Sequence, residues 1–180
     1  MSSDETPSTA GFDAWKRAIS DGFETAENRH VSIYVRSTLP PLGAKSRQER
    51  VIDSLDGMVE RGLLDSVDLV VTGDRLCLCG TCTGTTGGGE VVDLVERLRE
   101  WRGPAGASAA PFFERREVTS AIAGESATAI VPPRVAVSLS LDDSLAGVFP
   151  CRVGSEHYTV EDFLGVLGEL ERPELSPVGP

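Results

Sequence analysis

The sequence predicts a single α/β domain with a mixed four-stranded sheet and helices packed on it, in the order β-α-β-α-β-β-α. Three stretches carry this prediction. Residues His30–Ser37 alternate apolar and polar side chains, as a half-buried strand does. Residues 134–150 hold two apolar-rich runs joined by the acidic turn Asp142-Asp143-Ser144, the pattern of a β-hairpin. Residues 159–170 then place apolar side chains at helical spacing.

The N-terminal part of the chain predicts a helix that precedes this domain. Phe12, Trp15, Ile19 and Phe23 recur at spacings of three and four, which indicates an amphipathic helix laid against the domain as an appendage. Both ends of the chain are rich in Ser, Pro and acidic residues and are expected to be disordered. The expected organisation is a tail over 1–11, an N-terminal helix over 12–28, one α/β domain over 29–172 and a tail over 173–180.

The middle of the chain supplies the first crossover unit. Ser46 and Glu49 match a capping box, which predicts a helix that starts there and ends at Gly62. Val67–Thr72 is nearly continuous in Leu and Val, as a buried parallel strand would be. Glu90–Trp101 predicts a second helix, which Gly103-Pro104 stops.

Residues 105–132 have the weakest pattern. Glu114–Ser120 is interpreted as an extended edge segment and Ala121–Thr128 as a loop. The final helix has a clearer start, because Thr159 is followed three residues later by Asp162.

The order of elements resembles the thioredoxin-like fold over residues 30–171. In that fold a proline precedes the third strand and a helix closes the domain, and Val131-Pro132-Pro133-Arg134-Val135 fits this arrangement. The resemblance places a Cys-x-x-Cys motif within Ser37–Ser46, where this chain has no cysteine. The usual thioredoxin chemistry is therefore absent from that position.

A second resemblance is to small uncharacterised proteins of halophilic archaea, some of which carry a helix-turn-helix label. It rests on the Arg47-Gln48-Glu49-Arg50 helix, the run Phe-Phe-Glu-Arg-Arg-Glu-Val at 112–118, and the Thr-Val-Glu-Asp stretch at 159–162. This resemblance implies no activity.

The charge composition favours a high-salt cytoplasm. The formal net charge is −11, with 28 acidic residues, and Lys16 and Lys45 are the chain's two lysines against fifteen arginines. Such a charge argues against a general affinity for phosphate backbones. Concentrated salt screens charges beyond a few ångström and so weakens this argument, and nucleic acid is therefore not excluded as a partner. The sequence shows neither a signal-peptide pattern nor an apolar run that could span a bilayer, which predicts a cytoplasmic protein without a membrane partner.

Three cysteines within six residues form the one cluster with potential chemistry. Cys77, Cys79 and Cys82 could supply three thiolates to zinc, with Cys151 as the fourth ligand if a loop folds back. Cys79 and Cys82 also have the spacing of a redox pair, although the next helix begins too late to activate a thiol. Buried or incidental thiols are the remaining alternative.

Other patterns have a functional interpretation beside a structural one. Arg47, Arg50 and Arg61 followed by an extended Val67–Leu78 match a recognition helix and a β-wing, but acidic residues share that helix. The Gly80–Gly89 loop lacks a P-loop lysine and is interpreted as a connector. His30 and His157 have no neighbouring nucleophile motif and are assigned capping or surface roles.

The sequence therefore predicts a protein that acts by binding or assembly rather than by recognisable catalysis, with a protein partner or a homo-oligomer as the expected form of assembly. Two alternatives remain: a cysteine-dependent zinc or redox protein, and a DNA-binding regulator.

Overall fold

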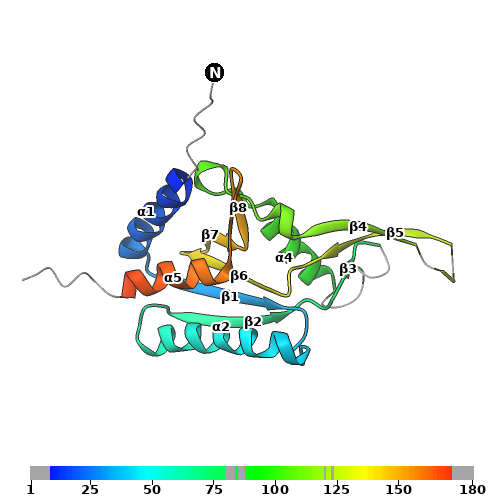
Figure 1. Cartoon of the computed structure of the whole chain (residues 1–180), viewed down its shortest axis with the longest axis horizontal. Helices are drawn as coiled ribbons and strands as arrows, with labels where there is room; N and C mark the ends of the chain where they lie inside the picture. The colour runs from blue at the N-terminus through cyan, green and yellow to red at the C-terminus, as the bar shows by residue number, and fades with distance from the viewer. Residues whose placement is uncertain (1–8, 80–83, 85–87, 120, 123, 172–180) are drawn as a thin grey trace, which may run out of the picture.

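The fold is organised around a mixed four-stranded sheet with the strand order β2-β1-β6-β7 (Figure 1). A computed structural model describes residues 9–79, 84, 88–119, 121–122 and 124–171. The strands are β1 (Arg29–Val35), β2 (Ser66–Val71), β6 (Val135–Leu141) and β7 (Ser144–Phe149). β1 pairs parallel with β2 and antiparallel with β6, and β6 pairs antiparallel with β7. The predicted mixed four-stranded sheet is confirmed.

The turn of the β6–β7 hairpin is built from the two aspartates that the sequence indicated. Asp142 and Asp143 have φ values of 49° and 66°, a left-handed conformation that Asp tolerates better than most residues. The Asp142 carboxylate accepts hydrogen bonds from the backbone N–H groups of Glu27 and Asn28, at 2.9 and 2.8 Å. The turn is thereby tied to the segment that leads into β1.

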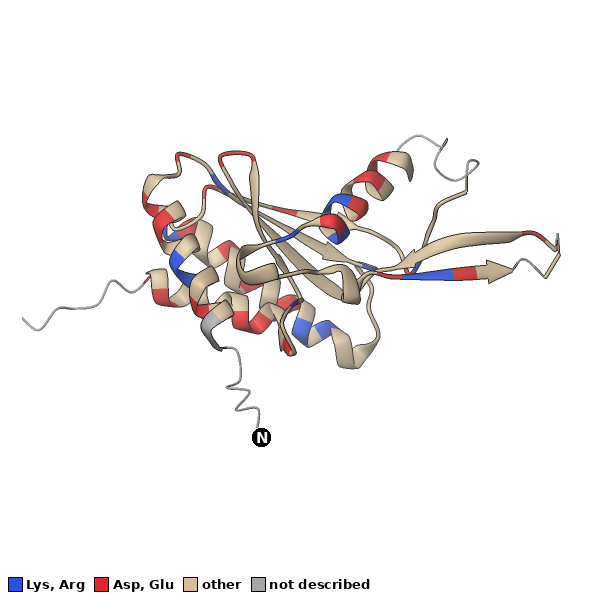
Figure 2. Cartoon of the chain, turned by 90° about the horizontal axis from the view of Figure 1, so that it is seen from above, with Lys and Arg blue, Asp and Glu red and all other residues tan. Residues whose placement is uncertain are grey.

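Helices cover both faces of the sheet (Figures 1 and 2). α2 (Leu42–Glu60) and α5 (Val160–Glu171) lie on one face, and α4 (Gly88–Glu100) lies on the other. α5 begins with a capping box in which Thr159 and Asp162 exchange backbone-to-side-chain hydrogen bonds of 2.7 and 3.2 Å. The start predicted for α2 is wrong: the helix begins at Leu42, after Pro41, without a side-chain cap from Ser46.

The N-terminal helix α1 (Thr9–Thr25) contributes to the main core. Trp15, Ile19 and Phe23 are all buried. The Trp15 indole donates a hydrogen bond of 3.2 Å to the Ala146 carbonyl of β7, and its ring packs edge-on against Phe149 at 4.9 Å between centroids. A glycine at 147 makes this approach feasible, because a Cβ there would lie 3.1 Å from the indole. α1 therefore packs against the β7 edge of the sheet.

The opposite edge of the sheet is β2, which the sequence pattern predicted to be buried. That prediction is wrong, because β2 is an edge strand and Leu69 and Val71 are 44% and 48% exposed. A continuous run of Leu and Val indicates an extended strand, but the position of that strand in the sheet depends on the rest of the topology.

A second, three-stranded sheet with the order β3-β5-β4 extends away from the first (Figure 1). Its strands are β3 (Leu76–Cys77), β4 (Glu114–Thr119) and β5 (Ser126–Val131). β4 and β5 pair antiparallel along their whole length and project as a hairpin, which we call the wing. The loop predicted over Ala121–Thr128 is therefore wrong in its second half, where β5 begins at Ser126.

Short elements connect these parts. The turns η1 (Pro104–Gly106) and η2 (Ala110–Phe112) follow α4, and the small hairpin β8 (Cys151–Val153) and β9 (Glu156–Tyr158) follows β7. Backbone hydrogen bonds between Ser108 and Arg152, at 3.0 and 2.8 Å, join the two regions. The sequence did not indicate this small hairpin.

Candidate functional site

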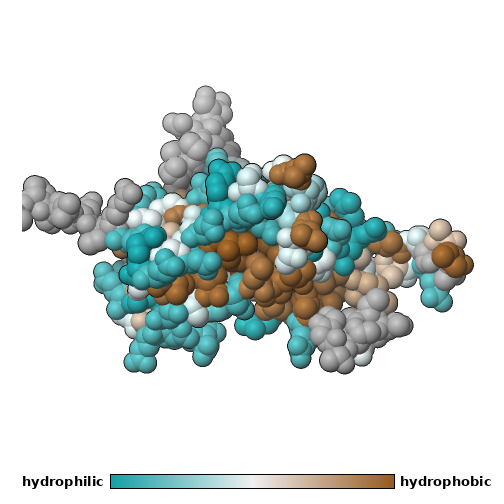
Figure 3. Space-filling model, turned by 90° about the horizontal axis from the view of Figure 1, so that it is seen from below, coloured by the Kyte–Doolittle hydropathy of each residue, from teal (hydrophilic) through white to brown (hydrophobic). Residues whose placement is uncertain are grey.

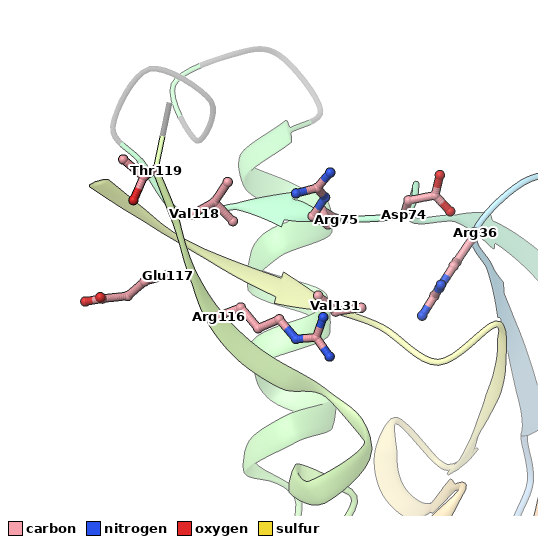
Figure 4. Close-up of a pocket in the computed structure, with 8 residues that line it drawn as sticks. All are labelled: Arg36, Asp74, Arg75, Arg116, Glu117, Val118, Thr119 and Val131. Atoms are coloured by element: carbon pink, nitrogen blue, oxygen red, sulfur yellow. The ribbon is translucent and has the colours of Figure 1, made fainter. Parts of the chain in front are cut away.

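A surface hollow lies where the wing meets the main sheet (Figure 4). Its volume is about 560 Å³. Three arginines from separate parts of the chain line it: Arg36 after β1, Arg75 before β3, and Arg116 on β4. Two acidic residues, Asp74 and Glu117, also line it, and the Glu117 side chain is directed away from the three arginines (Figure 4). We call this feature the arginine hollow.

The arginines of the hollow are held to different degrees. Arg36 donates a 2.8 Å hydrogen bond from Nε to the Pro132 carbonyl, which fixes its guanidinium beside the segment leading into β6. Arg116 pairs with Glu114 at 2.9 Å, and that hydrogen bond lowers the pKa of the Glu114 carboxyl. Arg75 is exposed at the edge of the hollow. A guanidinium in this setting can bind a phosphate or carboxylate through two parallel hydrogen bonds.

The wing is fixed to the body of the protein by its own charged residues. Arg115 of β4 pairs with Glu96 of α4 through contacts of 2.7 and 2.8 Å to the two carboxylate oxygens. Arg99 of α4 donates to the Phe113 carbonyl at 3.1 Å, just before β4 begins. These contacts hold the base of the wing against α4, so the arginine hollow has a defined wall on that side.

Charge is unevenly distributed over the molecule (Figure 2). The first part of α2 carries Lys45, Arg47 and Arg50 together with Glu49, which pairs with Lys45, whereas its second part carries Asp53, Asp56 and Glu60. The basic part of α2 and the arginine hollow both follow the carboxyl end of β1. Three arginines therefore gather at the hollow, and the basic residues of α2 lie near the same end of β1, although acidic side chains pair with Lys45, Arg47 and Arg116.

The predicted recognition helix and wing do not have the expected form. Residues 67–71 form a strand of the main sheet, and the wing is formed by β4 and β5 instead. Arg47 pairs with Glu161 of α5, with its Nε 2.5 Å from Oε1, and Arg61 pairs with Glu171. The hydrogen bond from Arg47 lowers the pKa of Glu161 to about 2. Both arginines thus link α2 to α5.

The structure brings two of the four predicted cysteine ligands together. The Sγ atoms of Cys77 and Cys79 lie 3.0 Å apart, and both residues are half-buried. Cys82 lies outside the described residues. Cys151 is buried in β8, where burial raises the pKa of its thiol to about 12 and the charge of Asp162 adds to the effect. Within the described parts of the chain, no group of three or more His, Cys, Asp or Glu side chains could hold a metal ion.

The two histidines have different surroundings. His30 bridges β1 and β2, with its ring nitrogens 2.7 Å from Ser66 Oγ and 3.1 Å from Asp68 Oδ1. This is a strand-pairing role that the sequence pattern did not predict. His157 packs edge-on against Phe112 at 5.3 Å. The glycine-rich loop between 80 and 89 lies mostly outside the described residues, and α4 begins at Gly88.

Sequence reasoning missed the arginine hollow. Arg36, Arg75 and Arg116 are far apart in the chain, and no short motif connects them. Their proximity depends on the pairing of β3 and β4 with β5, a strand that was not predicted. If residues 114–120 and 126–131 had been predicted to pair as strands, Arg116 would have been expected near Arg75.

Comparison with known proteins gives one match. A family model described as a helix-turn-helix domain matches residues 23–172. No curated protein and no solved structure matches the chain. In the part of the chain that the structure describes, at least one strand separates each α-helix from the next. None of the helices described there is long and apolar enough to cross a membrane.

Proposed function

The chain belongs to this helix-turn-helix domain family, and from that membership we propose that it is a DNA-binding protein. The match over residues 23–172 is the observation that carries the proposal, because it covers the sheet, the wing and helices α2, α4 and α5. This is the interpretation that the sequence left as an alternative to binding or assembly without DNA. The contact surface that we propose is the arginine hollow together with the wing.

The shape of the wing supports this surface. A two-stranded β-ribbon fits the major groove of B-DNA, and the exposed strand β4 projects from the body as part of such a ribbon. Guanidinium groups at its base would contact phosphates, which position a protein on the duplex. α2 is a weaker candidate because Arg47 and Arg61 tie it to glutamates of another helix, α5, whereas Arg116 pairs with the exposed Glu114 of its own strand.

The acidic character of the chain limits the affinity that we expect. Asp74 at the hollow would repel phosphates, and the net charge of −11 opposes approach to DNA at low salt. At molar salt concentration the repulsion between charges is screened beyond a few ångström, so it no longer acts at long range. We therefore expect few phosphate contacts and a shallow dependence of affinity on salt.

The DNA-binding proposal predicts a measurable effect of the arginines. Labelled duplex DNA from the region upstream of the gene should gain fluorescence anisotropy when the full chain is added in molar KCl. Replacing Arg75 and Arg116 together by Ala should weaken binding about tenfold or more. The slope of log affinity against log salt should also become shallower, by about one for each phosphate that the variant no longer neutralises. An unchanged affinity in this variant would contradict the proposed surface.

The matched control for this experiment is Arg17→Ala on α1. Arg17 is exposed, and α1 lies at the other end of the molecule from the wing (Figure 1). The control removes one positive charge without touching the hollow, so its affinity should stay within about twofold of the wild-type value. If no duplex binds the wild-type protein, the DNA-binding proposal itself fails.

The pair formed by Cys77 and Cys79 favours a second proposal, a thiol function of the base of the wing. Their Sγ atoms are close enough to supply two of the four ligands of a zinc ion or to be oxidised together, and Cys82, outside the described residues, is the proposed third ligand. We expect zinc to co-purify with the full chain, and the variant with Cys77→Ser and Cys79→Ser to lose it. Zinc well below one equivalent in the wild type, by elemental analysis, would contradict metal binding.

We propose two finer assignments on indirect grounds. The strand order β2-β1-β6-β7, with β1 and β2 parallel and the other two pairs antiparallel, supports a thioredoxin-like sheet. The excess of acidic residues and the presence of only two lysines support an origin in a high-salt cytoplasm. Under that proposal the free energy of unfolding rises with KCl concentration.

A further inference from the structure

The open edge of the main sheet points to self-association. β2 ends the sheet on one side and carries the exposed apolar residues Leu69 and Val71. Figure 3 looks at the side of the molecule on which α2 and β2 lie and shows apolar side chains gathered in a central band. Natural edge strands are usually protected by Lys, Pro, a bulge or a covering element. β2 contains neither Lys nor Pro, its pairing with β1 is regular, and its one charged residue is Asp68.

The other edge of the same sheet shows such protection. There α1 packs against β7, and Trp15 donates to the Ala146 carbonyl. The β7 edge is covered by α1, whereas the β2 edge is not covered by a described element. An exposed apolar edge strand can pair with a strand of another chain. We propose that β2 pairs with β2 of a second copy of this chain in antiparallel orientation, and that this pairing joins two four-stranded sheets into one continuous sheet.

The backbone of β2 is suited to this pairing. The Thr72 N–H donates to the Val35 carbonyl of β1 at 2.8 Å. Peptide groups alternate in direction along a strand, so Val67, Leu69 and Val71 direct their N–H and C=O groups to the open edge. A two-fold axis at Leu69 then opposes Leu69 to Leu69, and Val67 to Val71, as hydrogen-bonded pairs.

The side chains select the same register. With the axis at Leu69, the exposed apolar residues face apolar residues, and Asp68 faces Val70 of the second copy. A shift that moved the axis to Asp68 would oppose two carboxylates, which is destabilising across a strand pair. A shift that moved it to Val70 would leave Val67 opposite Gly73, beyond the end of β2. The sequence of β2 is therefore self-complementary in one register.

This dimer would also shape the proposed DNA-binding function, and this step alone rests on that proposal. The arginine hollow follows the carboxyl ends of β1 and β2, and the two β2 strands run in opposite directions. The hollows of the two copies therefore lie at opposite ends of the joined sheet. Such a dimer matches a DNA site with two separated half-sites.

The test measures the mass of the full chain in solution, by light scattering and sedimentation in molar KCl. The wild type should have twice the 19.1 kDa mass of one chain. Leu69→Lys places two like charges opposite each other at the axis and should raise the dimer dissociation constant about tenfold or more. The control Ile122→Lys changes a fully exposed residue of the wing and should leave the dimer intact.

A pair of variants at one position tests the register. Val70→Asp would face Asp68 of the second copy and should dissociate the dimer, whereas Val70→Lys would face the same carboxylate with opposite charge and should keep it. Both substitutions introduce a charge at the same half-buried position, so a loss of folding would affect both variants, whereas a loss of pairing would affect only Val70→Asp. A monomeric wild type, or a dimer that neither Leu69→Lys nor Val70→Asp weakens, would overturn the proposal. A monomeric Leu69→Lys variant that still binds DNA would separate dimerisation from DNA binding.

Discussion

Replacement of Trp15 by Ala is expected to lower the free energy of unfolding by about 3–5 kcal/mol. Trp15 is 1% exposed and contacts side chains from three parts of the chain. Its ring stacks with Phe12 at 5.6 Å and packs edge-on against Phe149 at 4.9 Å, and Phe163 of α5 lies 6.3 Å away. The variant loses this packing and the hydrogen bond to Ala146, and it leaves a cavity between α1 and β7.

Chemical denaturation followed by circular dichroism measures this change. A domain of this size has a stability of about 5–15 kcal/mol, so the expected loss is a large fraction of the total. The control Trp15→Phe keeps most of the ring and should cost clearly less than Trp15→Ala. A loss below about 1 kcal/mol in Trp15→Ala would mean that α1 is an appendage rather than part of the core.

The second large effect is expected at the β6–β7 turn. Asp142→Ala removes an acceptor that binds the N–H groups of both Glu27 and Asn28, and should cost about 2–3 kcal/mol. Part of any loss arises from the backbone, because alanine at a φ of 49° is strained.

Asp143→Ala separates the two causes of that loss. Asp143 also has a positive φ, 66°, but its exposed side chain does not share the contacts of Asp142 with Glu27 and Asn28. The same substitution there should cost about 1 kcal/mol. Equal losses in the Asp142 and Asp143 variants, by thermal or urea unfolding, would show that the contacts of Asp142 with the segment before β1 contribute nothing.

The elements that were predictable from sequence share a strong local signal. β1 has strict alternation, the β6–β7 hairpin has an acidic turn, and α5 has both helical periodicity and the Thr159–Asp162 capping box. In each case the apolar pattern lies within one short stretch, and in the hairpin and α5 that stretch also contains the turn or capping residues. The structure has these elements close to the expected positions.

The elements that were missed depend on contacts between residues that are far apart in the chain. The sequence of β5 is Ser-Ala-Thr-Ala-Ile-Val, and its first four residues alternate Ser or Thr with Ala, whose small side chain gives only a weak apolar signal. Its strand conformation comes from backbone pairing with β4 on one side and β3 on the other. The arginine hollow depends on this pairing, so the site was invisible until the wing was known.

The cysteine cluster illustrates the limit of a spacing argument. Cys77 and Cys79 are two residues apart on an extended segment, which places them on the same side, and their sulfurs meet at 3.0 Å. Cys151 is distant in sequence and is buried in a different hairpin. The predicted redox pair was Cys79 and Cys82, and Cys82 lies outside the described residues, whereas the position of Cys151 depended on the β8–β9 hairpin.

Hydrogen exchange of the full chain, with and without bound duplex, tests the proposed DNA interface most directly. We expect DNA to slow amide exchange in β4 and in the segment 72–77, which carry Arg116 and Arg75, while exchange in α2 stays unchanged. Protection confined to α2 would contradict the assignment of the interface to the wing and the arginine hollow.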